Sequence, residues 1–167
     1  MIRVLGIDPG SRVTGYGVVD VEGNQTRFVD CGCIDVSRQD FPYRLRGIFD
    51  GMSDVLERMR PDAVAIEKVF VQRNVDSALK LGQARGAAIC AVLARELTLS
   101  EYSPTEIKQA IVGRGRAEKQ QVVHMVSLLL GIQKKLREDA ADALACALCH
   151  VHITQTQNRL MTQQVRR

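Results

Sequence analysis

No run of hydrophobic residues in this sequence approaches the roughly 20 needed to cross a membrane. Its N-terminus, Met1-Ile2-Arg3-Val4, enters a strand pattern at once and leaves no room for a signal peptide. Four prolines and thirteen glycines are too few for a collagen-like chain, and five cysteines, an odd number, are expected to be free thiols. We therefore expect the 167 residues to form one soluble cytoplasmic domain with no membrane partner.

Charge is unevenly distributed along the chain, although the net charge is only +4. Residues 1–67 carry 8 Lys or Arg against 11 Asp or Glu, whereas residues 68–137 carry 12 against 5. A basic middle third is typical of a protein that binds a polyanion such as nucleic acid. A solvated basic helix face gives the same pattern, so charge alone leaves both interpretations open.

Hydrophobic spacing predicts three strands first, at 4–7, 16–19 and 26–36. They must be antiparallel, because the turns between them are too short for a crossover. The remaining pattern alternates between helix and strand, with helices over 41–59, 76–97, 105–112, 117–130 and 139–154 and strands at 63–66 and 99–102.

This order predicts an α/β fold with a mixed sheet, in which three antiparallel strands are followed by parallel ones and helices cover both faces. We expect residues 1–155 to form a single domain and residues 156–167, which are polar and basic, to be a disordered tail.

Four acidic residues lie where the pattern predicts a core. Asp8 ends the first buried strand, Glu67 ends the fourth, and Asp139 and Asp142 lie three residues apart on one face of the last helix. Each has a simpler explanation: a turn at Asp8, an ion pair with Lys68 at Glu67, or a favourable helix dipole at the two aspartates. If the first and fourth strands are parallel neighbours, however, their ends bring Asp8 and Glu67 together.

Four converging carboxylates carry a charge that two divalent cations would neutralise. Oxygen ligands without His or Cys suit Mg²⁺ or Mn²⁺. Two such ions activate a water molecule and stabilise the leaving oxygen in phosphodiester hydrolysis. The acids therefore predict a two-metal nuclease site beside the basic segment.

The motifs around these acids resemble those of the RuvC family of Holliday junction resolvases. They are Gly6-Ile7-Asp8-Pro9-Gly10-Ser11, Ala65-Ile66-Glu67, the run from Asp76-Ser77-Ala78 to Arg85-Gly86, and Asp139-Ala140-Ala141-Asp142-Ala143. The resemblance spans about residues 2–155 and implies a ribonuclease-H-like fold. It also implies a homodimeric endonuclease of recombination and repair that nicks four-way DNA junctions symmetrically, leaves 5′-phosphate and 3′-hydroxyl ends, and works with the RuvA and RuvB branch-migration proteins.

The resemblance assigns metal-binding catalytic roles to Asp8, Glu67, Asp139 and Asp142. It also matches Phe70 to a junction-contacting aromatic residue, and Lys108 and Lys119 to two functional lysines. Arg73, Arg114 and Arg116 are further candidates for DNA contact, because they lie in the basic segment. From the residues alone, Phe70 either stacks on a base or anchors its loop in the core, and each cation is equally well a solvated surface charge.

Three other patterns point elsewhere. Small residues from Ala78 to Ala91, including Gly82 and Gly86, suit either core packing or a dimer interface. The run from Cys146 to His150 matches a c-type haem attachment site, but we assign it to helix packing because the helix is expected to be buried. The Asp8-Pro9-Gly10 loop also resembles the first phosphate loop of actin-like ATPases and sugar kinases, which is the alternative function.

Overall fold

The computed structural model describes residues 1–69 and 74–165. Its five-stranded sheet has the order β3-β2-β1-β4-β5. The strands are β1 (Ile2–Asp8), β2 (Val13–Glu22), β3 (Gln25–Asp35), β4 (Ala63–Glu67) and β5 (Leu99–Tyr102). The first three pair antiparallel, while β4 pairs parallel to β1 and β5 parallel to β4. The mixed α/β sheet predicted from the sequence is therefore confirmed.

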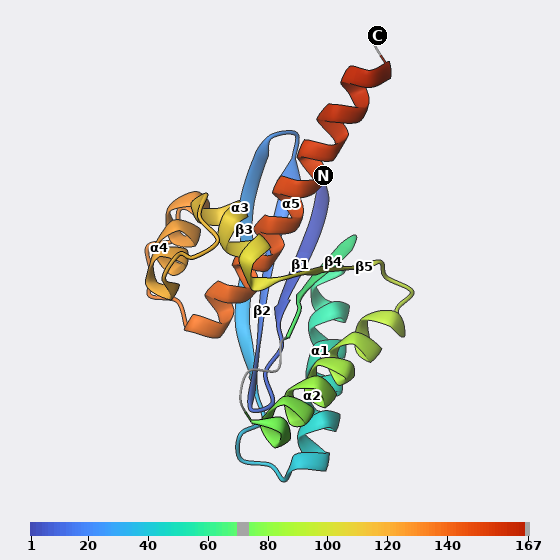
Figure 1. Cartoon of the computed structure of the whole chain (residues 1–167). Helices are drawn as coiled ribbons and strands as arrows, with labels where there is room; N and C mark the ends of the chain where they lie inside the picture. Colours follow the sequence, from blue (N-terminus) through green and yellow to red (C-terminus); the bar gives the residue numbers. More distant parts are fainter. Residues whose placement is uncertain (70–73, 166–167) are drawn as a thin grey trace.

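Helices cover both faces of the sheet, as Figure 1 shows. On one face lie α1 (Phe41–Met59) and α2 (Val75–Leu93), and on the other α3 (Pro104–Val112), α4 (Lys119–Leu130) and α5 (Glu138–Val165). Each face has its own hydrophobic core. Leu5, Ile7 and Ile66 pack under α1 and α2, whereas Val4 and Ala65 pack under α5. The central strands are buried on both sides, which explains their unbroken apolar runs.

Helix α5 lies unusually close to the sheet. A Cβ atom added to Gly6 of β1 would overlap the carbonyl oxygen of Ala143, and one added to Gly17 of β2 would overlap Leu144. The middle of the helix is apolar on all sides, and Leu144 and Leu148 are at most 1% exposed. Glycines in the two strands therefore let the helix backbone rest almost directly on the sheet.

Three helix ends differ from the sequence-based expectation. Helix α2 ends at Leu93 rather than near Leu97, because Glu96 adopts a left-handed conformation with φ of 57°. Helix α4 begins at Lys119 rather than at residue 117. Glu118 caps it, because its amide donates a hydrogen bond of 3.0 Å to the Gln121 side chain.

The third difference is at the C-terminus, where α5 continues to Val165 instead of ending at Thr154. Two side chains fasten this extension to the turn between β2 and β3: Gln155 donates to the Gly23 carbonyl at 3.0 Å and Arg159 to Asn24 at 2.8 Å. Residues 156–165, expected to be a disordered tail, are therefore described as helix, and Figure 1 shows this end projecting beyond the sheet. That residues 1–155 form a single domain stays a prediction. None of the described helices is long and apolar enough to span a membrane.

Candidate active site

Two acids meet at the carboxyl ends of the central parallel strands. Ile7 of β1 is in register with Ile66 of β4, so the next residue on each strand, Asp8 and Glu67, ends its strand at the same edge of the sheet. The parallel pairing that would bring them together is thus present. The edge where parallel strands end is where α/β proteins commonly bind ligands.

The first turn of α5 brings Asp139 to the same edge. Asp8 is paired in register with Gly15 of β2, and a Cβ atom on Gly15 would overlap the carbonyl oxygen of Asp139. The missing side chain at Gly15 thus makes room for the start of α5 directly beside Asp8. Asp142 follows one turn later. Gly15 was not identified from the sequence, although its place opposite a strand-ending acid was a usable signal.

Burial and mutual repulsion perturb the acids. Burial, followed by the charges of Glu67, Asp142 and Asp139, raises the pKa of Asp8 from 3.8 to about 8. Burial and the charge of Asp142 raise the pKa of Glu67 from 4.5 to about 7, and burial also raises the pKa of Asp142. These acids interact electrostatically, so β1, β4 and the start of α5 converge on one site. Strongly perturbed acids at one edge of a sheet are typical of a functional site.

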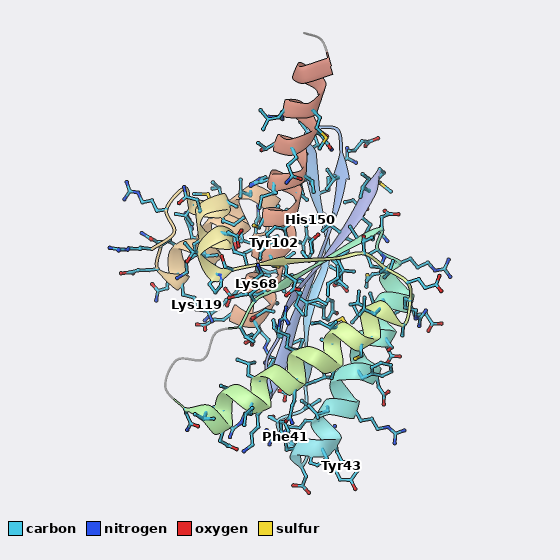
Figure 2. All side chains as sticks on the ribbon, turned by 45° about the vertical axis from the view of Figure 1, so that its right-hand side comes forward. Phe41, Tyr43, Lys68, Tyr102, Lys119 and His150 are labelled. Carbon is cyan, nitrogen blue, oxygen red and sulfur yellow. The ribbon has the colours of Figure 1, made fainter. Side chains whose placement is uncertain are left out.

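Two lysines partly balance this charge. The Lys119 ammonium group lies 3.0 Å from an oxygen of Asp142 and 3.1 Å from an oxygen of Glu138. Partial burial opposes its charge, but the hydrogen bonds to Asp142 and Glu138 outweigh that effect and raise the pKa of Lys119. Figure 2 shows Lys119 at the start of α4, on the side that faces α5. The role of Glu138 in this ion pair was missed in the sequence.

A cavity of about 190 Å³ opens beside the acids. It is lined by Glu67, Pro104, Ile107, Lys108, Lys119, Val122 and Asp142. Lys108 also acts electrostatically on Glu67 and lowers its pKa against the larger effect of burial. The cavity therefore combines two carboxylates with two cations, a mixture suited to a phosphate ester held by lysines next to acids.

Among the side chains that the structure describes, no three Asp, Glu, His or Cys groups are gathered closely enough to hold a metal ion as they stand. The donors nevertheless fit a hard divalent cation. They offer only carboxylate oxygens, and the pKa values of Asp8 and Glu67 are raised first by burial and then by the neighbouring acids, so a bound cation would favour their charged forms. Lys119, paired with Asp142, supplies part of the positive charge at this edge.

The remaining candidates for DNA contact do not line the cavity beside the acids, or lie outside the described residues. Arg114 and Arg116 are exposed on the loop between α3 and α4, outside the residues that line the cavity. Phe70 and Arg73 lie outside the described residues, so their roles stay predictions. Lys68, which directly follows Glu67, is exposed near Glu106; the sequence suggested it only as an ion-pair partner of Glu67, not as a DNA contact.

The haem-like pattern serves helix packing. Cys146 and Cys149 are both 0% exposed, and burial raises the pKa of each thiol. His150 hydrogen-bonds through Nδ1 to the Tyr102 hydroxyl at 2.9 Å, and Figure 2 shows these two side chains together. His152 contacts the Ala110 carbonyl oxygen at 3.1 Å. Both imidazoles therefore have partners within the fold.

Comparison with known proteins identifies clear relatives. The family model for crossover junction endodeoxyribonuclease RuvC matches residues 4–150. The protein of that name from Methylococcus capsulatus is 55% identical over 167 residues, 100% of both chains. The one from Alkalilimnicola ehrlichii is 56% identical over 160 residues, which is 96% of this chain and 97% of that one. The structure of T. thermophilus RuvC in complex with Holliday junction substrate has a TM-score of 0.87 and 35% identity, covering 94% of this chain and 97% of the other.

Proposed function

The chain belongs to the RuvC family of crossover junction endodeoxyribonucleases, and on that basis we propose that it resolves Holliday junctions by paired, symmetric nicks. The observation that carries the proposal is the convergence of Asp8, Glu67 and Asp142 at one edge of the sheet, beside a cavity with two lysines. Asp139 lies in the first turn of α5, the helix that closes this edge. The reaction is hydrolysis of a phosphodiester bond that leaves 5′-phosphate and 3′-hydroxyl ends.

Membership of this nuclease family implies dependence on a divalent metal. We propose Mg²⁺ or Mn²⁺, two ions per site, held by Asp8, Glu67, Asp139 and Asp142, because these acids offer hard oxygen ligands only. When bound, the ions would supply Lewis-acid activation of water and charge stabilisation at the leaving oxygen. The protein's own contribution is to fix the four carboxylates from rigid elements, two from strand ends and two from a buried helix.

The lysines bind the substrate rather than the metal. Lys108 and Lys119 line the cavity and would hold the non-reacting oxygens of the phosphate group that is cut. For Lys119 this requires the ammonium group to leave Asp142 and Glu138, which frees those carboxylates as the phosphate arrives. Arg114 and Arg116 would contact the DNA backbone further from the cut. We propose junction contacts for Phe70 and Arg73 from the sequence resemblance alone.

A four-way junction with two equivalent cuts requires two active sites, and α2 offers the surface for a homodimer. Its outer face carries the apolar side chains of Val75, Leu79 and Leu93, which are 68%, 62% and 55% exposed. Gly82 and Gly86 lie between them, with no atom within 4 Å of an added Cβ. These positions follow the i, i+4, i+7 spacing of one helix stripe, so a second copy of α2 can pack closely against it.

Further partners rest on family membership alone. We propose that the protein acts in the cytoplasm, on junctions processed by the RuvA and RuvB branch-migration proteins. We also propose that residues 1–155 are sufficient for the nuclease fold.

The phosphate-loop alternative is not favoured, because the Gly10 amide donates to the Thr14 hydroxyl, which in turn donates to the Gly10 carbonyl at 3.0 Å. That amide is therefore occupied within its own turn.

One gel tests the proposed reaction. A labelled four-way junction and a linear duplex of the same sequence are incubated with the protein, with and without Mg²⁺. The proposal expects nicks only in the junction, at symmetric positions and only with metal. Asp8→Asn should abolish cutting but retain junction binding, whereas Asp50→Asn, which changes an exposed acid on α1, should cut normally. Cleavage by Asp8→Asn at the wild-type rate would show that the acids do not form the active site.

A further inference from the structure

One arginine joins the catalytic edge of the sheet to the helix on its other face. Arg85 lies on α2, and its side chain is only 17% exposed. Its Nε donates to the backbone carbonyl of Glu67 at 3.2 Å, and its Nη2 forms an ion pair with Glu101 on β5. One guanidinium group thus contacts both β4 and β5 at the end where the acids gather.

The carbonyl that Arg85 holds is the last one of strand β4. Pairing between β1 and β4 ends at Ile66, so Glu67 has no partner residue on the β1 side. On the β5 side, the Lys68 amide donates to the Tyr102 carbonyl at 2.8 Å, and the chain then leaves the sheet. The strand end is therefore held by its pairing with β5, in which Glu67 is still in register with Tyr102, and by Arg85. How firmly the Glu67 backbone is held limits how precisely its carboxylate is aimed.

Glu67 and Arg85 approach from opposite faces of the sheet. Ile66 packs into the core under α1 and α2, so the next side chain, that of Glu67, points toward α5 and Asp142. Arg85 comes from the α2 side and contacts only the backbone of Glu67. Its cation is thus placed to fix the strand without entering the cavity, and it is absent from the cavity lining.

We propose that Arg85 is a positioning residue, which fixes the end of β4 so that the Glu67 carboxylate stays aimed at the other acids. This inference rests on the proposed function in that Glu67 belongs to the active site. Because the outer face of α2 is the proposed dimer surface, Arg85 also links that surface to the catalytic edge. Glu101 on the neighbouring strand holds the guanidinium in place.

The fork geometry of Arg is essential to this role. A Lys at position 85 retains the positive charge and the ion pair with Glu101, but one ammonium group on a flexible stem does not reproduce two fixed contacts. Arg95 provides a matched control. It follows the same helix and pairs with a carboxylate, that of Glu57 at 3.2 Å, but it is far more exposed and bonds to α1 rather than to β4.

The experiment compares Arg85→Lys, Glu101→Gln and Arg95→Lys in the full-length protein. Junction affinity is measured without divalent metal, single-turnover cleavage with saturating Mg²⁺, and amide hydrogen exchange at Lys68 by NMR. Arg85→Lys should cleave at least about 10-fold more slowly, since a displaced catalytic group is costly. Its junction Kd should stay within about twofold of wild type, and the Lys68 amide should exchange faster. Glu101→Gln should shift both readouts in the same direction, and Arg95→Lys should shift neither.

Two results would overturn the proposal: cleavage by Arg85→Lys within about twofold of wild type, or a loss of cleavage fully matched by weaker junction binding. Unchanged exchange at Lys68 would also refute it. The exchange arm requires no cleavage, so it tests Arg85 even if the wild-type protein cuts no junction. If the wild-type protein cuts no junction, the proposed nuclease function fails, while the exchange result still decides the proposal on Arg85.

Discussion

Replacing Asp8 by Asn should stabilise the metal-free protein while abolishing its proposed activity. The pKa of Asp8 is raised from 3.8 to about 8, first by burial and then by the charges of Glu67, Asp142 and Asp139. A carboxyl whose pKa is higher in the folded state keeps its proton longer there than in the unfolded chain. Its contribution therefore favours folding below about pH 4 and is lost as the pH rises to about 8.

The magnitude follows from the size of the shift. About four units at about 1.4 kcal/mol each give a cost near 6 kcal/mol for ionising Asp8 alone. Asp8 and Glu67 titrate as a coupled pair, so part of this cost is shared between them. We expect Asp8→Asn to raise the free energy of unfolding by about 2–5 kcal/mol at pH 8, and by almost nothing near pH 4.

Urea unfolding followed by far-UV circular dichroism measures this difference, with EDTA present and the pH varied between about 4 and 8.5. In millimolar Mg²⁺ the wild-type protein should regain stability through metal binding, and the advantage of the Asp8→Asn variant should shrink or reverse. Asp50→Asn controls for the loss of any carboxylate and should change stability by less than about 0.5 kcal/mol at every pH. A stability difference between Asp8→Asn and wild type that does not grow with pH would refute the electrostatic reasoning.

Three further changes test other parts of the structure. Gly15→Ala should destabilise the protein by about 1–3 kcal/mol, because the new Cβ overlaps Asp139; unfolding in urea measures this, and an unchanged midpoint would contradict the close contact. Lys119→Ala should weaken junction binding and make the dependence of log Kd on log salt shallower by about one unit, and an unchanged slope would rule out phosphate contact. Leu79→Glu should produce a folded monomer by light scattering, because that side chain is exposed on α2; a persistent dimer would place the interface elsewhere.

The sequence predicted those features that depend on local patterning. The strands before Asp8 and Glu67 have continuous apolar runs, and the sheet buries both of their faces. The acids could be recognised because charged side chains at the ends of such runs conflict with burial. Their convergence depended on the parallel pairing of β1 and β4, which the structure contains.

Features that depend on contacts between distant segments were not predictable in the same way. The extension of α5 to Val165 depends on Gln155 and Arg159 reaching the turn near Gly23, and nothing local marks that contact. The pairing of Lys119 with Glu138 likewise joins two helices across a loop. Arg85 was part of a motif in the sequence, but no role could be inferred for it there, because its partners lie on two strands of the folded sheet.

The glycines beneath α5 determine which substitutions this active site can accept. Where Gly6 and Gly15 face the helix, the atoms nearest an added Cβ are main-chain atoms, which no rotamer change can move, and at Gly17 they belong to the side chain and amide of Leu144. Elsewhere the core can exchange one apolar side chain for another of similar volume and leave the acids where they are. Activity should therefore be sensitive to mutation at three positions that carry no functional group, and a directed-evolution library should keep them unmutated.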